Sequence, residues 1–174
     1  MPSPVGHALG AIAAGWAVAE PATTRRARLW QMTLLAGIGI APDLDLLIGR
    51  HSKETHSIGA AVIAAGVAAL VRLPIASSRV RIFAAAWAAW LSHPLLDMMG
   101  DDSSPPFGVM TWWPFSTAHF TLPLSLFPSI YRQWREPGFA AHNLGAIAVE
   151  LAVLVPVVLT VWWLRERSQK LSTT

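Results

Sequence analysis

The sequence has no cysteine and few charged residues. The absence of cysteine excludes disulfides and metal sites built from thiolates. Charged residues make up 13% of the 174 residues, about half of the roughly 25% usual in soluble domains. This is too few charged residues to cover the surface of a soluble protein. In addition, 53% of the residues are hydrophobic, and the mean hydropathy of the chain is +0.45. We therefore predict a single integral-membrane domain spanning residues 1–174.

The amino terminus lacks the positive charge that opens a secretory signal. Its first ten residues, MPSPVGHALG, hold no Lys or Arg, whereas Arg25, Arg26 and Arg28 follow the first apolar stretch. Although Ala17–Ala19 resembles a cleavage site, this order of charges is the reverse of that in a signal peptide. We expect an uncleaved helix whose amino terminus lies outside the cell membrane.

Five apolar segments predict the fold. A spanning helix needs about 20 apolar residues, with a range of about 17 to 25, so the first and third segments are short. The stretch Phe120–Tyr131 carries Pro123 and Pro128 and is interpreted as a broken or interfacial helix in a long outer loop. The fold class expected is all-α, a polytopic membrane helical bundle with about five transmembrane helices. The segments are roughly Val5–Ala19, Leu29–Ile48, Ile58–Leu73, Ile82–Met99 and Leu144–Leu164.

The basic residues predict the orientation of this bundle. The pI near 10.2 is compatible with a nucleic-acid partner, but the basic residues flank apolar segments instead of forming a patch, so lipid is the expected partner. With five spans and the amino terminus outside, nine Lys and Arg residues fall in the cytoplasm and four outside, as in bacterial inner membrane proteins. The cytoplasmic set is Arg25, Arg26, Arg28, Arg72, Arg79, Arg81, Arg165, Arg167 and Lys170; the outer set is Arg50, Lys53, Arg132 and Arg135.

The residues that bind metals converge on the outer side. All six histidines fall there on this topology, although the topology was drawn from Lys and Arg alone. Asp43 and Asp45 in PDLD, and Asp97 in WLSHPLLDMMG, fall on the same side. The histidines are His7, His51, His56, His93, His119 and His142.

Each motif also has an ordinary structural interpretation. His93 and Asp97 lie one turn apart on one helix face, where they can form a simple hydrogen bond or bind one cation. Asp43 can cap the turn after Pro42, and Thr55 or Ser57 in HSKETHS can cap the next helix. A lone His7 beside glycines is often only a packing residue.

Together the motifs predict a metal site. Zinc binds imidazole and carboxylate where no thiolate is present, so we expect one or two divalent ions, Zn²⁺ first among them. The expected ligands come from four helices and are His7, Asp43, His56, His93 and Asp97.

These motifs resemble the bacterial inner-membrane metal-dependent hydrolase family, a domain of unknown function with PDxD, HRxxTHS and SHxxxD motifs. The resemblance covers about residues 1–120 and departs from the family at Ser52, where arginine is usual. A more distant likeness is to helical zinc-dependent phospholipase C and P1-type nucleases, whose later HxxxE is missing because Ala146 stands four residues after His142.

The resemblance implies metal-assisted hydrolysis of a lipid-like phosphoester or ester. Besides the metal ligands, it implies catalytic roles for Asp43 and Asp45, one of them as a general base or as an orienting group. The expected substrate-binding residues are His51, Arg50, Lys53 and Trp113; for Trp113 an interfacial aromatic belt is the favoured alternative.

Two other classes of function stay open on the sequence. A metal-binding membrane protein without catalysis, such as a transporter or sensor, keeps the same ligands. A small helical scaffold uses its polar residues only to join helices.

The predicted orientation can be tested directly. A reporter fused at the carboxyl terminus should be active only in the cytoplasm, because nine basic residues are expected on that side. A fusion in the long loop before the last segment should report from the outside. A periplasmic signal from the carboxyl-terminal fusion would contradict the topology.

Overall fold

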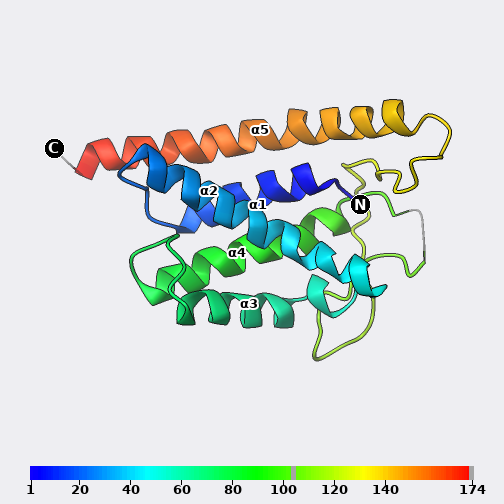
Figure 1. Ribbon diagram of the computed structural model, residues 1–174, viewed down its shortest axis with the longest axis horizontal. Coiled ribbons are helices and arrows are strands. Elements are labelled where there is room, and N and C mark those ends of the chain that lie inside the picture. The colour runs from blue at the N-terminus through cyan, green and yellow to red at the C-terminus, as the bar shows by residue number, and fades with distance from the viewer. Residues whose placement is uncertain (103–104, 173–174) are drawn as a thin grey trace.

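The computed structural model describes residues 1–102 and 105–172, and its regular structure there is helical (Figure 1). This confirms the all-α prediction, and each predicted apolar segment coincides with a helix. Two 3-10 helices, η1 and η2, lie between the second and third α-helices. The elements are α1 (Pro4–Val18), α2 (Arg25–Ile40), η1 (Ala41–Ile48), η2 (Glu54–His56), α3 (Ile58–Leu70), α4 (Arg79–Met98) and α5 (Phe139–Ser172).

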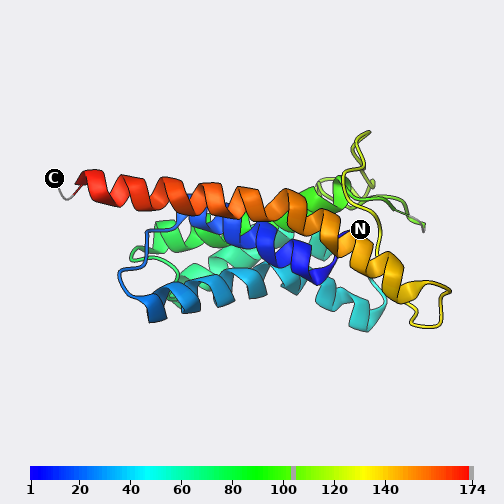
Figure 2. The ribbon, with the colours of Figure 1, turned by 90° about the horizontal axis from the view of Figure 1, so that it is seen from above.

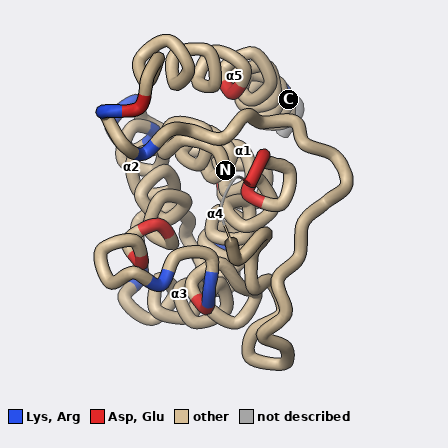
Figure 3. Tube along the Cα trace, turned by 90° about the vertical axis from the view of Figure 1, so that its right-hand side faces the viewer, with Lys and Arg blue, Asp and Glu red and all other residues tan. Residues whose placement is uncertain are grey.

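The α-helices lie side by side along the long axis and alternate in direction (Figures 1 and 2). One end of the bundle therefore gathers the amino terminus, η1, η2, the end of α4 and the start of α5. Figure 3 looks along the bundle at this end, with charged positions on the loops and mostly uncharged helices behind them. We call it the site end.

Small residues let the helices approach closely. α1 packs against α2, α4 and α5, while α3 packs against α4. Ala61 and Ala65 of α3 and Ala85 and Ala89 of α4 are completely buried. Such small-residue contacts are usual between helices in lipid, where there is no hydrophobic force to join them.

Two stretches are long and apolar enough to cross a membrane, Arg25–Ile48 and Phe139–Lys170. Only 28% and 17% of their most apolar windows are buried inside the protein, so both expose apolar surface. α1 and α3 are apolar but shorter. In the described residues, two of the about five predicted transmembrane helices are thus long and apolar enough to cross a membrane, judged by length and composition, and the remaining spans stay a prediction.

The predicted helix at Phe120–Tyr131 is wrong. This segment is extended and irregular, and it pairs through isolated bridges from Phe120 to Val109 and from Phe127 to Gly100. Pro123 and Pro128 each lack an N–H and disfavour helix in the residue before them. The backbone N–H groups of Leu126 and Phe127 instead donate to the Met99 carbonyl at the end of α4.

Two glycines of α2 provide a matched test of this packing. A Cβ atom at Gly39 would lie 2.2 Å from Cβ of Ala11 and 2.8 Å from the carbonyl oxygen of His7, whereas one at Gly37 meets no heavy atom within 4 Å. Gly39→Ala should lower the free energy of unfolding by about 1–3 kcal/mol. Gly37→Ala should not lower it, because alanine favours helix over glycine by up to about 1 kcal/mol. Thermal unfolding in detergent measures both, and equal stability of the two variants would refute this packing.

Candidate metal centre

The two aspartates of PDLD are positioned by η1. Pro42 lies in the first turn of this short helix, where its missing N–H costs nothing. Gly49 ends it with a φ of +67°, a left-handed conformation that favours glycine, and the chain turns back towards His51. The Asp45 side chain is buried, and that of Asp43 is 19% exposed. No side-chain cap forms at η1, so Asp43 is not the helix cap that the sequence also allowed.

The last two turns of α4 carry the second pair. His93 and Asp97 are both buried, with 3.2 Å between His93 Nε2 and Asp97 Oδ2. The four-residue spacing therefore places both side chains on one face, as predicted. Nδ1 of His93 donates a hydrogen bond of 2.6 Å to the Gly39 carbonyl, which leaves the Nε2 lone pair facing Asp97.

Four atoms that could bind a metal ion lie close together around Nε2 of His93. They are His56 Nε2, His93 Nε2, Asp43 Oδ1 and Asp97 Oδ2. His56 Nε2 lies 3.0 Å from His93 Nε2, 3.4 Å from Asp97 Oδ2 and 3.7 Å from Asp43 Oδ1, and His93 Nε2 lies 3.5 Å from Asp43 Oδ1. Tetrahedral zinc bonds of about 2.0–2.1 Å imply separations of about 3.3 Å between ligand atoms. The observed distances therefore fit ligands arranged around one cation.

His7 of α1 joins this group from the other side. Its Nε2 lies 3.4 Å from Asp97 Oδ1, and its ring stacks on that of His93 with centroids 3.6 Å apart. Among the described residues, no hydrogen-bond partner meets the buried oxygens of Asp97 or the buried Nδ1 of His7. Buried polar atoms are rarely left in this way, and a cation satisfies the carboxylate without further rearrangement.

Asp45 positions His56, one of the candidate metal ligands. Its Oδ2 lies 3.2 Å from Nδ1 of His56 and also accepts a hydrogen bond from the Thr55 hydroxyl. Its Oδ1 lies 3.2 Å from Nδ1 of His51. A carboxylate behind a histidine fixes the tautomer and the orientation of the ring, so Asp45 holds His56 with Nε2 towards the other donors.

The electrostatics of the cluster favour positive charge. In the described part of the chain, the ion pairs of Asp43, Asp45 and Asp97 are all with histidines. Burial alone lowers the pKa of His56, but the hydrogen bonds that its ring donates to the carboxylates of Asp43 and Asp45 outweigh burial and raise the pKa above its ordinary value. The field that holds a proton on His56 equally favours a bound cation.

His51 links the cluster to a residue that the sequence analysis missed. Arg132, in the loop before α5, points Nη2 at His51 Nε2 across 2.7 Å. A guanidinium only donates, so Nε2 is the acceptor and Nδ1 carries the proton that faces Asp45. No spacing or motif in the sequence connects residues 81 positions apart.

The other predicted substrate-binding residues are dispersed. Arg50 forms an exposed ion pair with Glu54. Lys53 lines a cavity of about 270 Å³ together with His51 and Arg132. Trp113 lies in the loop after α4, and its carbonyl accepts a hydrogen bond from the backbone N–H of Gly59.

The two remaining histidines lie outside the cluster. His142 contacts the Ser129 carbonyl at 2.8 Å through Nε2 and stacks on Tyr131, and His119 belongs to the loop before α5. Ser57, not Thr55, caps α3, by accepting from the N–H of Ala60.

Glu150 of α5 acts as a buried hydrogen-bonding group. It accepts from the backbone N–H of Ser3 at 2.6 Å and from the Ser3 hydroxyl, which also caps α1. It therefore fixes the start of the helix that carries His7. A Cβ atom at Gly6 would lie 2.8 Å from its Oε2, so this contact needs glycine at position 6.

The family model described as "YdjM inner membrane protein" matches residues 1–168 of the chain. The searches of the curated proteins and of the solved structures found no match.

Removing ligands tests the centre. His93→Ala and Asp97→Ala should each lower the metal content of purified protein by at least about tenfold, because each removes donor atoms at the point where the others meet. His142→Ala is the matched control and should bind as much metal as the unmodified protein. Elemental analysis of protein purified from membranes measures all three. Full occupancy in both ligand variants would refute the assignment.

Proposed function

The chain belongs to the YdjM inner membrane protein family, and on that premise we propose that it is a membrane-embedded, metal-dependent hydrolase. The proposed bond is a phosphoester or ester of a lipid-like molecule, cleaved at the site end of the bundle. The observation that carries this proposal is the meeting of His56, His93, Asp43 and Asp97 at separations of 3.0–3.7 Å.

The donor set suits a reactive centre better than a closed structural one. A structural zinc is enclosed by four protein ligands, whereas a catalytic zinc keeps one position for water or substrate. His56, His93 and Asp97 are almost completely buried, while the Asp43 side chain is 19% exposed. We assign the three buried residues as ligands and place Asp43 on the side where water and substrate enter.

His7 extends the ligand set. With His93 and Asp97 it forms a second group whose ligand atoms lie within 4.8 Å of one another. Asp97 presents Oδ1 to His7 and Oδ2 to His56 and His93. Because the two oxygens of Asp97 face different histidines, this arrangement is compatible with a site for one metal ion or for two.

The chemistry proposed follows from these positions. A divalent cation supplies hydroxide at neutral pH by lowering the pKa of a bound water to about 7. Asp43 is placed to accept a proton from the attacking water, and Asp45 keeps His56 in the ligating tautomer. Arg132 and Lys53 border a common cavity beside His51 and are placed to bind an anionic head group.

The proposed location follows the family and the charge pattern. The helices α1 to α5 would cross the inner membrane, with the site end facing outwards and the carboxyl terminus in the cytoplasm. The alternation of helix directions supports this, because it brings the nine basic residues at the connections to the end opposite the site.

Measuring hydrolytic activity and metal content in the same variants tests the proposal. Purified protein with zinc should hydrolyse members of a panel of phosphoesters and esters, lose this activity with chelator and regain it with zinc. Asp43→Asn should reduce turnover by about 100-fold or more, the usual contribution of a general base, while its metal content stays within about twofold of the unmodified protein. Asp97→Asn should lose both.

Equal loss of metal and turnover in Asp43→Asn would remove the proposed role of Asp43. A protein with full metal content and no hydrolysis of any substrate would instead support the alternative, a non-catalytic metal-binding membrane protein. His142→Ala again provides the control for folding.

A further inference from the structure

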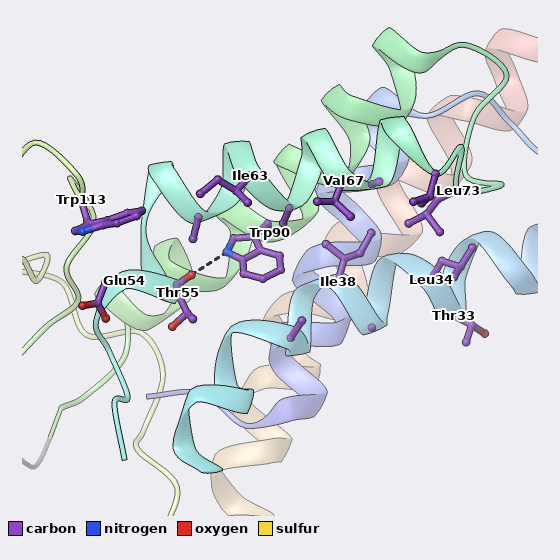
Figure 4. Close-up of a pocket in the computed structure, with 16 residues that line it drawn as sticks. Thr33, Leu34, Ile38, Glu54, Thr55, Ile63, Val67, Leu73, Trp90 and Trp113 are labelled. Carbon is purple, nitrogen blue, oxygen red and sulfur yellow. Dashed lines mark hydrogen bonds between the residues drawn. The ribbon is translucent and has the colours of Figure 1, made fainter. Parts of the chain in front are cut away.

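A long apolar groove separates α2 from α3. Both helices pack on α4, but the two do not pack against each other in the described part of the chain. The space between them has a volume of about 740 Å³ (Figure 4), within the range of about 300–1,000 Å³ usual for ligand pockets.

The walls of the groove are regular helix faces. Leu34 and Ile38 of α2 line one wall, and Ile63 and Val67 of α3 line the other, in each pair four residues apart. Trp90 of α4 lies between them, and its indole N–H donates to the Thr55 carbonyl at 2.8 Å. That bond satisfies its polar atom, so the ring offers the groove an apolar surface.

Small side chains keep the groove open. Gly37, Ala41, Ala60 and Ala64 lie among its lining residues, and a Cβ atom at Gly37 would meet nothing within 4 Å. Ile63 and Val67 are 60% and 54% exposed, so the groove opens sideways, towards the surroundings of the bundle.

One end of the groove is lined by sequence neighbours of the candidate metal ligands, although none of the five predicted ligands lines it. Glu54, Thr55 and Trp113 lie at this end (Figure 4). Thr55 directly precedes the ligand His56 and donates to Asp45, and Ala41 lies two residues before Asp43. The remainder of the lining is apolar apart from Thr33. The groove thus has a polar end beside the centre and an apolar body that leads away from it.

The length of the groove matches one leaflet of a bilayer. Its lining on the α3 side runs from Ala60 to Val71, which corresponds to about 16 Å at the helical rise of about 1.5 Å per residue. Half of a hydrocarbon core of about 30 Å is about 15 Å. A chain in the groove would therefore lie at the depth of the acyl chains around it.

We propose that this groove binds one acyl chain of a lipid whose phosphorylated head group is presented to the metal centre. This rests on the proposed function and names its substrate class, a membrane lipid in place of a soluble ester. A single chain fits the sideways opening, since a lipid can then enter from the leaflet without leaving it. Lys53 and Arg132 lie at the same end of the molecule for the phosphate.

Photo-labelling of the full chain in lipid nanodiscs with zinc tests the proposal. The probe is lysophosphatidic acid with a diazirine either near the head group or at the end of its chain. The first probe should label residues beside Thr55 and Ile38, and the second should label residues near Leu34 and Val71. Unlabelled lysophosphatidic acid should compete with both, and the same photoreactive chain on lysophosphatidylcholine, whose phosphate is a diester, should label more weakly.

Two glycines provide matched variants. Gly37→Phe fills the groove and should reduce labelling by about tenfold or more, because the chain loses its apolar contacts. Gly66→Phe adds the same side chain on α3 outside the groove, where a Cβ atom also meets nothing within 4 Å, and should leave labelling unchanged. Ala64→Phe blocks the groove from the opposite wall and should act like Gly37→Phe. Metal content close to that of the unmodified protein identifies variants that keep their fold.

The outcomes separate this inference from the function on which it rests. Labelling that Gly37→Phe and Ala64→Phe leave unchanged, or that spreads over α5, would overturn the groove as a lipid site. Zinc-dependent hydrolysis of short soluble esters without any groove labelling would overturn it too, while the hydrolase stands. If the two probes label opposite ends of the groove as expected, but no lipid or ester is hydrolysed in a zinc-dependent way, the lipid site is supported and the proposed hydrolase activity is refuted.

Discussion

The structure depends on two buried carboxylates, Asp45 and Asp97, and the partly buried Asp43, which lie among histidines at one end of an apolar bundle. Removing an ionised carboxylate from water costs several kcal/mol unless opposite charge and hydrogen bonds compensate for it. Asp97 is 2% exposed, and neither of its oxygens has a hydrogen-bond partner in the part of the chain that the structure describes. Asp45, in contrast, is satisfied by Thr55 and two histidines. A cation bound between His56, His93 and Asp97 would supply opposite charge. His7, His56 and His93 lie 3.2–3.4 Å from the oxygens of Asp97, so either protonated histidines or a bound cation can balance its charge.

The rest of the fold holds those side chains in place. Gly39 lets α1 approach α2 and gives its carbonyl to His93. Glu150 secures the start of α1, and with it His7, through Ser3. At the opposite end Arg165 of α5 donates to the carbonyl of Glu20 at 2.8 Å and joins α5 to the turn after α1. Each of these polar contacts ties together helices whose remaining surfaces are apolar, which explains how a bundle with little charge keeps a defined arrangement.

Much of this architecture could be predicted from the sequence because its signals are local. Apolar runs indicated the five helices, and the spacing of His93 and Asp97 gave one helix face. The convergence of PDLD and THS on that face followed from alternating helix directions. The conformation of the loop before α5 could not be predicted. Pro123 and Pro128 prevent a helix there, and the bridges that the loop forms with Gly100 and Val109 are contacts that local sequence does not record. Arg132 beside His51 and the groove between α2 and α3 depend on tertiary packing, which no periodicity records.

The central claim is that side chains from separate helices share a cation, and X-ray absorption spectroscopy at the zinc edge tests it most directly. Protein purified from membranes without added metal should give a spectrum with nitrogen and oxygen ligands at about 2.0–2.2 Å, imidazole scattering and no sulfur. The same measurement on His93→Ala should lose that signal. Well-folded protein without any bound metal, or a zinc signal that His93→Ala leaves unchanged, would contradict the account.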